Sequence, residues 1–183
     1  MTDTKVKICG LTRRVDALGA AQAGADYLGV VLVPETPRAR SPEEARDILD
    51  GILAPYVIVV ADMDLPRVTR AAETVRASVV QLHGDESPEL AEAVNQAGPW
   101  EVWKALRVRG KNDVMEGLAR FSGYVDGVLL DGWHPEKKGG TGTPFSWEEV
   151  AEIRDVWPPG IALVAAGGLG PHNIREAVDL IRP

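Results

Sequence analysis

Seven short runs of apolar, largely β-branched residues recur along the chain, and each is followed by a segment with helical periodicity. The runs lie roughly 25 residues apart. They are residues 6–9, 27–33, 57–60, 79–82, 102–106, 127–130 and 161–165. Because they are continuously apolar rather than alternating, they predict strands of a parallel sheet that is buried on both faces. Strict alternation of strand and helix restricts the fold to an open doubly wound sheet or a closed barrel.

Helix start signals support this alternation. Ser41-Pro42-Glu43-Glu44 and Ser87-Pro88-Glu89 each combine an N-cap serine, a proline at the first helical position and an acid near the positive end of the helix dipole. The other helices are expected through Val15, Leu18 and Ala21 to Gly24, over about 65–76 and 112–121, from Ser146, and over about 171–181.

Glycine and polar residues favour the barrel over the open sheet. The first strand ends in Cys9-Gly10-Leu11-Thr12-Arg13, which is not the G-x-G-x-x-G of a dinucleotide-binding fold, and the sequence has no Walker A loop. Such residues instead follow many different strands, where a barrel builds its site. We expect one α/β domain over residues 1–183, a TIM (β/α)8 barrel with seven units visible and the eighth missing by C-terminal truncation.

The charge and cysteine content limit the partners. The chain has a net charge of −7 and a pI near 5.0, which argues against nucleic acid and anionic membranes but not against a small anionic substrate. The single cysteine excludes an intrachain disulfide and fits a reducing compartment. No apolar run approaches the roughly 20 residues that span a bilayer. We expect a cytoplasmic protein that is a monomer or homodimer.

Cys9 and Asp131 are the residues most suited to acid–base chemistry. Cys9 ends the first strand near a helix N-terminus, a setting that favours a reactive thiolate. The alternative is a small buried hydrophobic residue, since free cysteine is often buried. Asp131 follows four apolar residues and would point into the barrel mouth, where a carboxyl group can act as a general acid. Its alternative is an ordinary aspartate at the start of a loop.

Further polar residues follow other strands. Arg38 and Arg40 lie on a proline-rich loop and are either carboxylate or phosphate ligands or solvated surface residues. His83 follows the fourth strand and is either an acid–base group or a packed ring. One cysteine and three scattered histidines make a zinc site improbable on composition. Trp103, Trp147 and Trp157 are interpreted as core residues.

In chain order these segments resemble the phosphoribosylanthranilate isomerase family. The matching segments are Lys7-Ile8-Cys9-Gly10-Leu11-Thr12, Gln81-Leu82-His83-Gly84-Asp85-Glu86, Leu129-Leu130-Asp131, Gly139-Gly140-Thr141-Gly142 with Phe145 and Trp147, and Ala166-Gly167-Gly168-Leu169. The resemblance implies the Amadori rearrangement of N-(5-phosphoribosyl)anthranilate to 1-(2-carboxyphenylamino)-1-deoxyribulose 5-phosphate. This is a step of tryptophan biosynthesis that acts on a small phosphosugar and uses no cofactor and no metal.

The resemblance also implies roles for individual residues. Cys9 matches the family's general base, which takes the proton from C2 of the sugar, and Asp131 matches the general acid, which protonates the ring oxygen. Arg38 matches an arginine near the anthranilate carboxylate. Four glycines and His83 complete the expected substrate-binding set, and the glycines are Gly140, Gly142, Gly167 and Gly168. The family's last strand has no counterpart before Pro183.

Two alternatives stay open at this stage. The chain could be another phosphosugar barrel enzyme, such as the indole-forming lyase of the same pathway, which relies on lysine and glutamate at strand ends. Lys104, inside the fifth strand, is a poor substitute for that lysine. The chain could also be a truncated barrel fragment without activity of its own.

Overall fold

A computed structural model describes residues 4–132 and 146–183 as an α/β protein with seven strands, each joined to the next through a helix. The chain divides into two compact units, with the boundary between Val102 and Trp103. The strand–helix alternation expected from the sequence is confirmed in both units, which are described in turn. That the fold is a closed barrel with a missing eighth unit stays a prediction.

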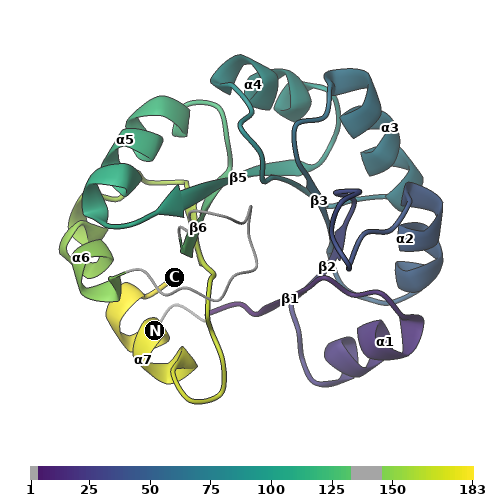
Figure 1. Ribbon diagram of the computed structural model, residues 1–183, viewed down its shortest axis with the longest axis horizontal. Coiled ribbons are helices and arrows are strands. Elements are labelled where there is room, and N and C mark those ends of the chain that lie inside the picture. Colours follow the sequence, from purple (N-terminus) through teal and green to yellow (C-terminus); the bar gives the residue numbers. More distant parts are fainter. Residues whose placement is uncertain (1–3, 133–145) are drawn as a thin grey trace. The chain divides into compact units, whose positions relative to one another are not determined.

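The first unit contains four parallel strands with their helices on one side (Figure 1). The strands are β1 (Lys7–Cys9), β2 (Tyr27–Val31), β3 (Tyr56–Val60) and β4 (Val79–Leu82). The helices are α1 (Arg14–Gln22), α2 (Pro42–Leu49), α3 (Leu65–Val75) and α4 (Pro88–Gln96). Each helix follows the strand of the same number, and each strand pairs with the next strand along the chain.

Strand register places the side chains of Cys9 and Gln81 on the same face of the sheet in this unit. Cys9 pairs with Gly29, Gly29 with Val57, and Val57 with Val79. Neighbouring residues across a parallel ladder direct their side chains to the same face, and side chains alternate along each strand. Gln81 lies two residues after Val79 and therefore shares the face of Cys9.

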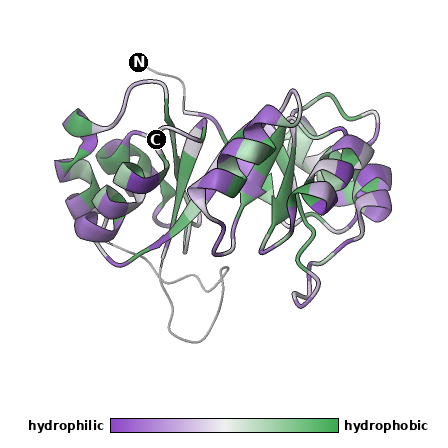
Figure 2. Cartoon of the chain, turned by 90° about the horizontal axis from the view of Figure 1, so that it is seen from above, coloured by the Kyte–Doolittle hydropathy of each residue, from purple (hydrophilic) through white to green (hydrophobic). Residues whose placement is uncertain are grey.

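Apolar residues fill the strands and the inner faces of the helices, as the hydropathy colouring in Figure 2 shows. Strands β2 to β4 are almost continuously buried, as expected of a parallel sheet covered on both faces. One expectation is wrong in detail. Val15 and Leu18, which were used to predict α1, are exposed, and only Ala17 of that helix is buried. Helix α1 therefore contacts the strands through small residues rather than through an apolar stripe.

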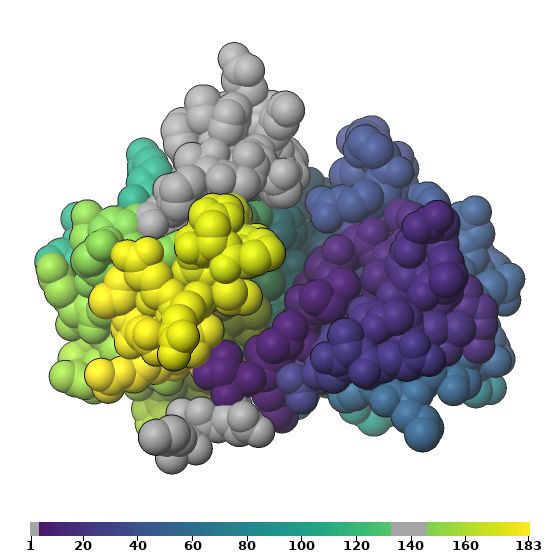
Figure 3. Space-filling view, turned by 90° about the horizontal axis from the view of Figure 1, so that it is seen from below, coloured from purple at the N-terminus to yellow at the C-terminus, as the bar shows by residue number. Residues whose placement is uncertain are grey.

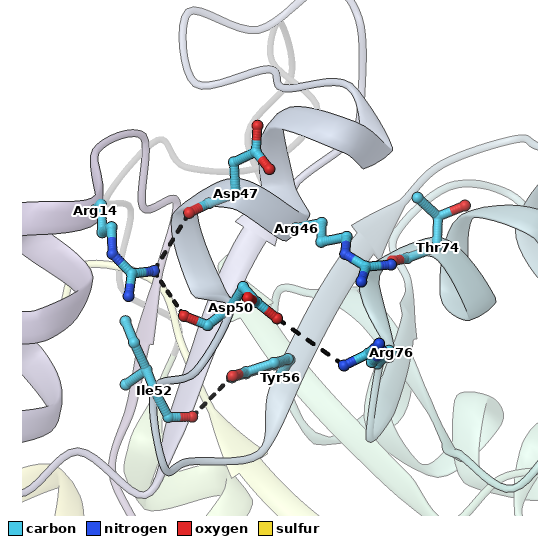
Figure 4. Close-up of polar contacts among 8 residues, drawn as sticks. All are labelled: Arg14, Arg46, Asp47, Asp50, Ile52, Tyr56, Thr74 and Arg76. Atoms are coloured by element: carbon cyan, nitrogen blue, oxygen red, sulfur yellow. Dashed lines mark hydrogen bonds and ion pairs between the residues drawn. The ribbon is translucent and has the colours of Figure 1, made fainter.

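Arginine side chains bind the C-terminal carbonyl groups of two of these helices (Figure 4). Arg14 Nη1 donates to the carbonyl oxygen of Asp50 at 2.7 Å and to that of Asp47 at 3.3 Å. Arg46 Nη1 donates to the carbonyl oxygen of Thr74 at 3.4 Å. The last carbonyl groups of a helix lack partners within the helix and carry partial negative charge. Each guanidinium therefore joins its own helix to the end of the next helix.

The N-cap of α3 makes stability depend on pH. Asp64 Oδ1 accepts from the Arg67 backbone N–H at 3.0 Å, and Oδ2 accepts from Arg67 Nε at 3.1 Å. The hydrogen bond from the Arg67 side chain is the main cause that lowers the pKa of Asp64, and the backbone N–H adds to it. A carboxylate whose pKa is lower in the folded state stabilises that state above the unfolded pKa, and this contribution is lost as the pH falls.

We therefore expect Asp64→Asn to remove a stabilisation that is fully present above about pH 4 and disappears as the pH falls below it. The measurement is the urea midpoint of both proteins from pH 7 down to the lowest pH at which they fold. Asn also caps helices, so the variant should retain α3. A difference between the two proteins that does not change with pH would contradict this expectation.

The second unit has three strands and three helices. The strands are β5 (Glu101–Val108), β6 (Gly127–Gly132) and β7 (Ala162–Ala165), of which β6 pairs in parallel with both others. The helices are α5 (Lys111–Phe121), α6 (Trp147–Glu152) and α7 (Ile174–Ile181), with a 3-10 turn at Arg154–Val156. Trp103, Trp147 and Trp157 are buried, as predicted. Helix α7, in yellow, lies beside α6 on the surface shown in Figure 3.

One face of these strands is covered by helix α5. Leu106 of β5 lies against Gly117 of α5, at a place where a Cβ on the glycine would collide with the leucine side chain. Arg107 therefore points to the opposite face, and the register pairs Arg107 with Asp131. The carboxyl group of Asp131 thus lies on the face away from α5.

Among the described helices, none has the length and apolar character of a membrane-spanning segment.

Candidate active site

Cys9 is an exposed residue at the end of β1. The interpretation of Cys9 as a small buried hydrophobic residue is therefore wrong. Its neighbour across the ladder is Gly29, where a Cβ would lie 3.1 Å from Cys9 Sγ and 3.3 Å from Cys9 Cα. Glycine at this position leaves room for the thiol, and Gly10 continues the chain with a φ of 81° that favours glycine. Thus Cys9 is a solvent-accessible thiol, and the Lys7 side chain approaches the same glycine, with its Cε 3.3 Å from the position of a Cβ on Gly29.

The loop after β2 brings Arg38 close to this thiol. A Cβ on Gly10 would lie 2.7 Å from both Cδ and Nη1 of Arg38, so the arginine side chain extends over the residue that follows Cys9. Arg40, by contrast, donates from Nε to the carbonyl oxygen of Thr12 at 3.4 Å and from its backbone N–H to Val31 at 2.9 Å. Of the two arginines, Arg38 is exposed and lies over Gly10, the residue after Cys9, while Arg40 holds the loop in place.

His83 lies in the first loop position after β4, within a network of hydrogen bonds. Its backbone N–H donates to Val60 at 2.8 Å, and its Nδ1 is 2.8 Å from the side-chain nitrogen of Gln81. The carboxylate of Glu86, which is 5% exposed, accepts from the backbone N–H of Gly84 and from that of Asp62 at 3.0 Å. Glu86 therefore joins the loop after β3 to the loop after β4.

Glycine is required in the middle of this network. A Cβ on Gly84 would collide with the side chain of Asp62 and would lie 2.7 Å from its backbone nitrogen. Asp62 itself has a φ of 53°, and its Oδ1 accepts from the Asp85 backbone N–H at 2.7 Å. The segment from Gln81 to Glu86 is a motif in the sequence, but the roles of Gln81, Asp62 and Glu86 were not predicted from it. The available signal was the carboxylate placed two residues after a glycine.

Asp131 is 4% exposed and is the penultimate residue of β6. The strand was expected to end at Asp131, and it continues one residue further, to Gly132, because the ladder with β5 extends to Val108. Gly167, which follows β7, packs against this carboxyl group, since a Cβ there would lie 2.8 Å from Asp131 Oδ1 and 2.7 Å from the Gly132 nitrogen. The second unit therefore joins Asp131 and the Gly167 loop into one site.

The loop after β7 is held in shape by Asn173. Gly167 and Gly168 have φ values of 82° and 67°, which only glycine adopts without strain. Asn173 Oδ1 accepts from the Gly170 backbone N–H at 2.8 Å, and Nδ2 donates to the Gly168 carbonyl oxygen at 2.9 Å. This asparagine was not singled out from the sequence, although side chains of this type commonly close such loops.

Lys104 does not belong to this face of the second unit. It is 3% exposed, and its Nζ lies 5.7 Å from the centre of the Phe121 ring in α5. It therefore points to the helix side of β5, whereas Asp131 points to the other side. This orientation disfavours the alternative in which a lysine at a strand end carries the chemistry.

Two expected site residues, Gly140 and Gly142, lie outside the described residues. Within residues 4–132 and 146–183, no group of three or more histidine, cysteine or acidic side chains could hold a metal ion. The structure therefore brings together two sets of predicted residues, one in each unit. Cys9 lies with Arg38, and Asp131 lies with Gly167 and Gly168.

Comparisons with known proteins agree with these motifs. The family model for N-(5'phosphoribosyl)anthranilate (PRA) isomerase matches residues 6–183. An N-(5'-phosphoribosyl)anthranilate isomerase from Geobacter sp. (strain M21) is 42% identical over 184 residues, which cover 98% of this chain and 84% of that protein.

Solved structures that match this chain include phosphoribosyl anthranilate isomerases. Phosphoribosyl anthranilate isomerase from Thermotoga maritima matches with a TM-score of 0.85 and 35% identity, covering 99% of this chain and 85% of that one. A phosphoribosyl anthranilate isomerase in complex with reduced 1-(o-carboxyphenylamino)-1-deoxyribulose 5-phosphate matches with a TM-score of 0.83 and 32% identity, covering 99% and 84%. From the family model, the relative and these structures together, the chain belongs to the N-(5'-phosphoribosyl)anthranilate isomerase family.

Proposed function

We propose that this chain catalyses the Amadori rearrangement of N-(5-phosphoribosyl)anthranilate to 1-(2-carboxyphenylamino)-1-deoxyribulose 5-phosphate in tryptophan biosynthesis. The observation that carries the proposal is the family match over residues 6–183, within which an accessible thiol ends β1 and a buried carboxyl group lies near the end of β6. The reaction is an internal proton transfer that neither gains nor loses electrons, so acid and base groups suffice for it.

The proposed roles of Cys9 and Asp131 are those that the family resemblance implies, and they fit the order of bond changes. Asp131 gives a proton to the furanose ring oxygen, the C1–O bond breaks, and the anthranilate nitrogen lone pair forms a C1=N bond. The Cys9 thiolate then removes the proton from C2, and the C–H electron pair forms the C1=C2 bond of an enolamine. C1 then gains a proton and the 2-hydroxyl group loses one, which gives the 2-ketone. Proton transfer by a positioned side chain contributes about 10²–10⁴-fold to such steps.

Arg38 and the Gly167–Gly168 pair are the proposed anchors at the two ends of the substrate. The exposed guanidinium of Arg38 extends over Gly10, beside the thiol, where it can bind the anthranilate carboxylate with two hydrogen bonds. The glycine pair lets the loop backbone approach the phosphate closely, as loops after the seventh strand of barrels often do. The proposed substrate carries its negative charge on one phosphate and one carboxylate. Positive charge is therefore needed only at the site, and a net negative charge on the whole protein is compatible with binding.

Asn173→Ala tests the phosphate end of this proposal. Without the two side-chain hydrogen bonds that close the loop from Gly168 to Gly170, we expect KM to rise about tenfold with little change in kcat, because one positioned hydrogen-bond network is worth about 1 kcal/mol or more. Inhibition by inorganic phosphate should weaken in parallel. Glu176→Ala, an exposed change in the first turn of α7, is the control. Unchanged KM and unchanged phosphate inhibition would contradict the assignment of this loop.

Incubation of the purified chain with each pathway intermediate tests the function as a whole. We expect N-(5-phosphoribosyl)anthranilate to be consumed and the deoxyribulose phosphate to accumulate without further reaction. Formation of indole products would favour the lyase, and a cooperatively melting chain with no turnover would favour a fragment that is inactive by itself. Size-exclusion chromatography on the same sample tests the prediction of a monomer or homodimer.

A further inference from the structure

The side chain of Gln81 lies against the ring nitrogen Nδ1 of His83. Gln81 Nε2 lies 2.8 Å from His83 Nδ1, and Gln81 is only 2% exposed. An amide nitrogen can donate but cannot accept, so His83 Nδ1 must accept this hydrogen bond. A neutral imidazole has a single N–H, which is therefore on Nε2.

The backbone on both sides of the His83 ring is held in place. The His83 N–H is bound to Val60, and the next N–H, that of Gly84, is bound by both oxygens of the buried Glu86 carboxylate at 3.0 Å. The hydrogen bond between Gln81 Nε2 and His83 Nδ1 restrains rotation of the ring about its side-chain bonds.

Gln81 also has a buried atom without a partner. Among the described residues, no group donates to Gln81 Oε1. Reversing the amide would turn Oε1 towards His83 and leave both N–H groups of the amide without acceptors. Buried N–H groups without a partner are rarer in proteins than buried carbonyl oxygens without one, so the orientation with Nε2 towards His83 is favoured. A methionine of similar size would avoid the cost entirely. A glutamine at this position therefore has a use that offsets the cost of its unmatched oxygen. The contact that the structure shows for its Nε2 is the hydrogen bond with His83 Nδ1.

We propose that Gln81 is a positioning residue that fixes the tautomer of the His83 imidazole, with the proton on Nε2 and with Nδ1 accepting from Gln81. His83 then takes part in the isomerisation as a hydrogen-bond donor and not as a base. The connection to isomerisation rests on the function proposed above, whereas the tautomer itself does not. Gln81 shares its sheet face with Cys9, so the strand that carries this pair presents it to the same side as the thiol.

Nitrogen-15 NMR of the histidine rings in the complete 183-residue chain reads the tautomer directly, without substrate. At pH 8, where an unperturbed imidazole is neutral, we expect His83 to give the shift pattern of an unprotonated Nδ1 and a protonated Nε2. Comparison with His83→Asn assigns the signals among the three histidines. A proton on Nδ1 of wild-type His83 overturns the proposal, and this measurement needs no variant of Gln81 that might fail to fold.

The variants Gln81→Glu and Gln81→Met distinguish the effect of the His83 tautomer from the effect of side-chain packing at position 81. A carboxylate at position 81 accepts from Nδ1, so we expect a proton on Nδ1 and a fall of about tenfold in kcat/KM. Methionine fills the space of the glutamine but donates no hydrogen bond. We expect it to lower kcat/KM by less than glutamate does, through a rise in KM. Gln96→Met, the same change at an exposed position of α4, should alter neither quantity. If Glu leaves both the tautomer and kcat/KM unchanged in a folded protein, Gln81 has no positioning role.

Failure of the proposed function gives a different pattern. If the wild-type chain shows no turnover, the isomerase assignment fails, while the NMR measurement still decides whether Gln81 fixes the tautomer. If wild-type turnover is normal and the proton is on Nδ1, the positioning role fails alone.

Discussion

Cys9→Ala is expected to lower kcat by about 10³-fold or more, because it removes the group proposed to take the proton from C2. KM should change much less, since the thiol is not a proposed anchor of either end of the substrate. Steady-state kinetics with N-(5-phosphoribosyl)anthranilate measures both quantities. Cys9→Ser keeps the size of the side chain but replaces the thiol by a much weaker acid, so it should lose nearly as much activity.

Stability separates this catalytic effect from misfolding. Cys9 is exposed, and substitutions at such positions usually change the free energy of unfolding by less than about 0.5 kcal/mol. Because Cys9 is the only cysteine, iodoacetamide reports on this one site, and alkylation should abolish activity in step with modification. Near-normal kcat in Cys9→Ala or in fully alkylated protein would contradict the assignment of Cys9 as the base.

Asp131→Asn is expected to lower kcat by about 10²–10⁴-fold, because an amide cannot give a proton to the ring oxygen. Asparagine has nearly the shape of aspartate, so it fits against Gly167 without the collision that a larger side chain would cause. Asp131→Ala should be equally inactive but less stable, since it leaves a cavity at a position that is 4% exposed.

Asp155→Asn is the matched control for this change. It makes the same chemical substitution at an exposed position of the 3-10 turn and should leave kcat and the melting temperature unchanged. If Asp131→Asn folds normally and retains kcat within a few-fold, the general acid must be another group. If both Asp131 variants are inactive and Asp131→Asn melts like the wild type, the loss is chemical rather than structural.

Local sequence signals were sufficient for the helix starts that carry an N-cap serine, and insufficient for the strand ends. They were also insufficient for α7, which was expected from about residue 171 and begins at Ile174. Ser41, Ser87 and Ser146 each accept a backbone hydrogen bond in the first turn of the predicted helix, because capping involves residues only three apart. Strand β5 is longer than the apolar run 102–106, because its ladder with β6 includes Arg107 and Val108. Pairing between distant segments decides where a strand ends, and it is not visible in either segment alone.

The same difference explains which site residues were found. Some site residues could be selected from the sequence because their residue types suggest their chemistry. These are Cys9, Asp131 and the pair Gly167–Gly168. Gln81, Glu86 and Asn173 act by holding other groups, and their partners are a histidine ring, two loop backbones and a glycine turn. Supporting residues of this kind become recognisable only when the contacts are known.

The amino-acid sequence by itself determined the alternation of strands and helices, and its ordered motifs identified the family. Both depend on periodicity and on residue types at short spacing, which are properties of single segments. The tertiary structure decided that Cys9 is exposed rather than buried, that Arg38 rather than Arg40 lies beside it, and that Gly167 packs on Asp131. Each of these facts depends on the register and packing of residues that are far apart along the chain, and only the folded molecule brings them into contact.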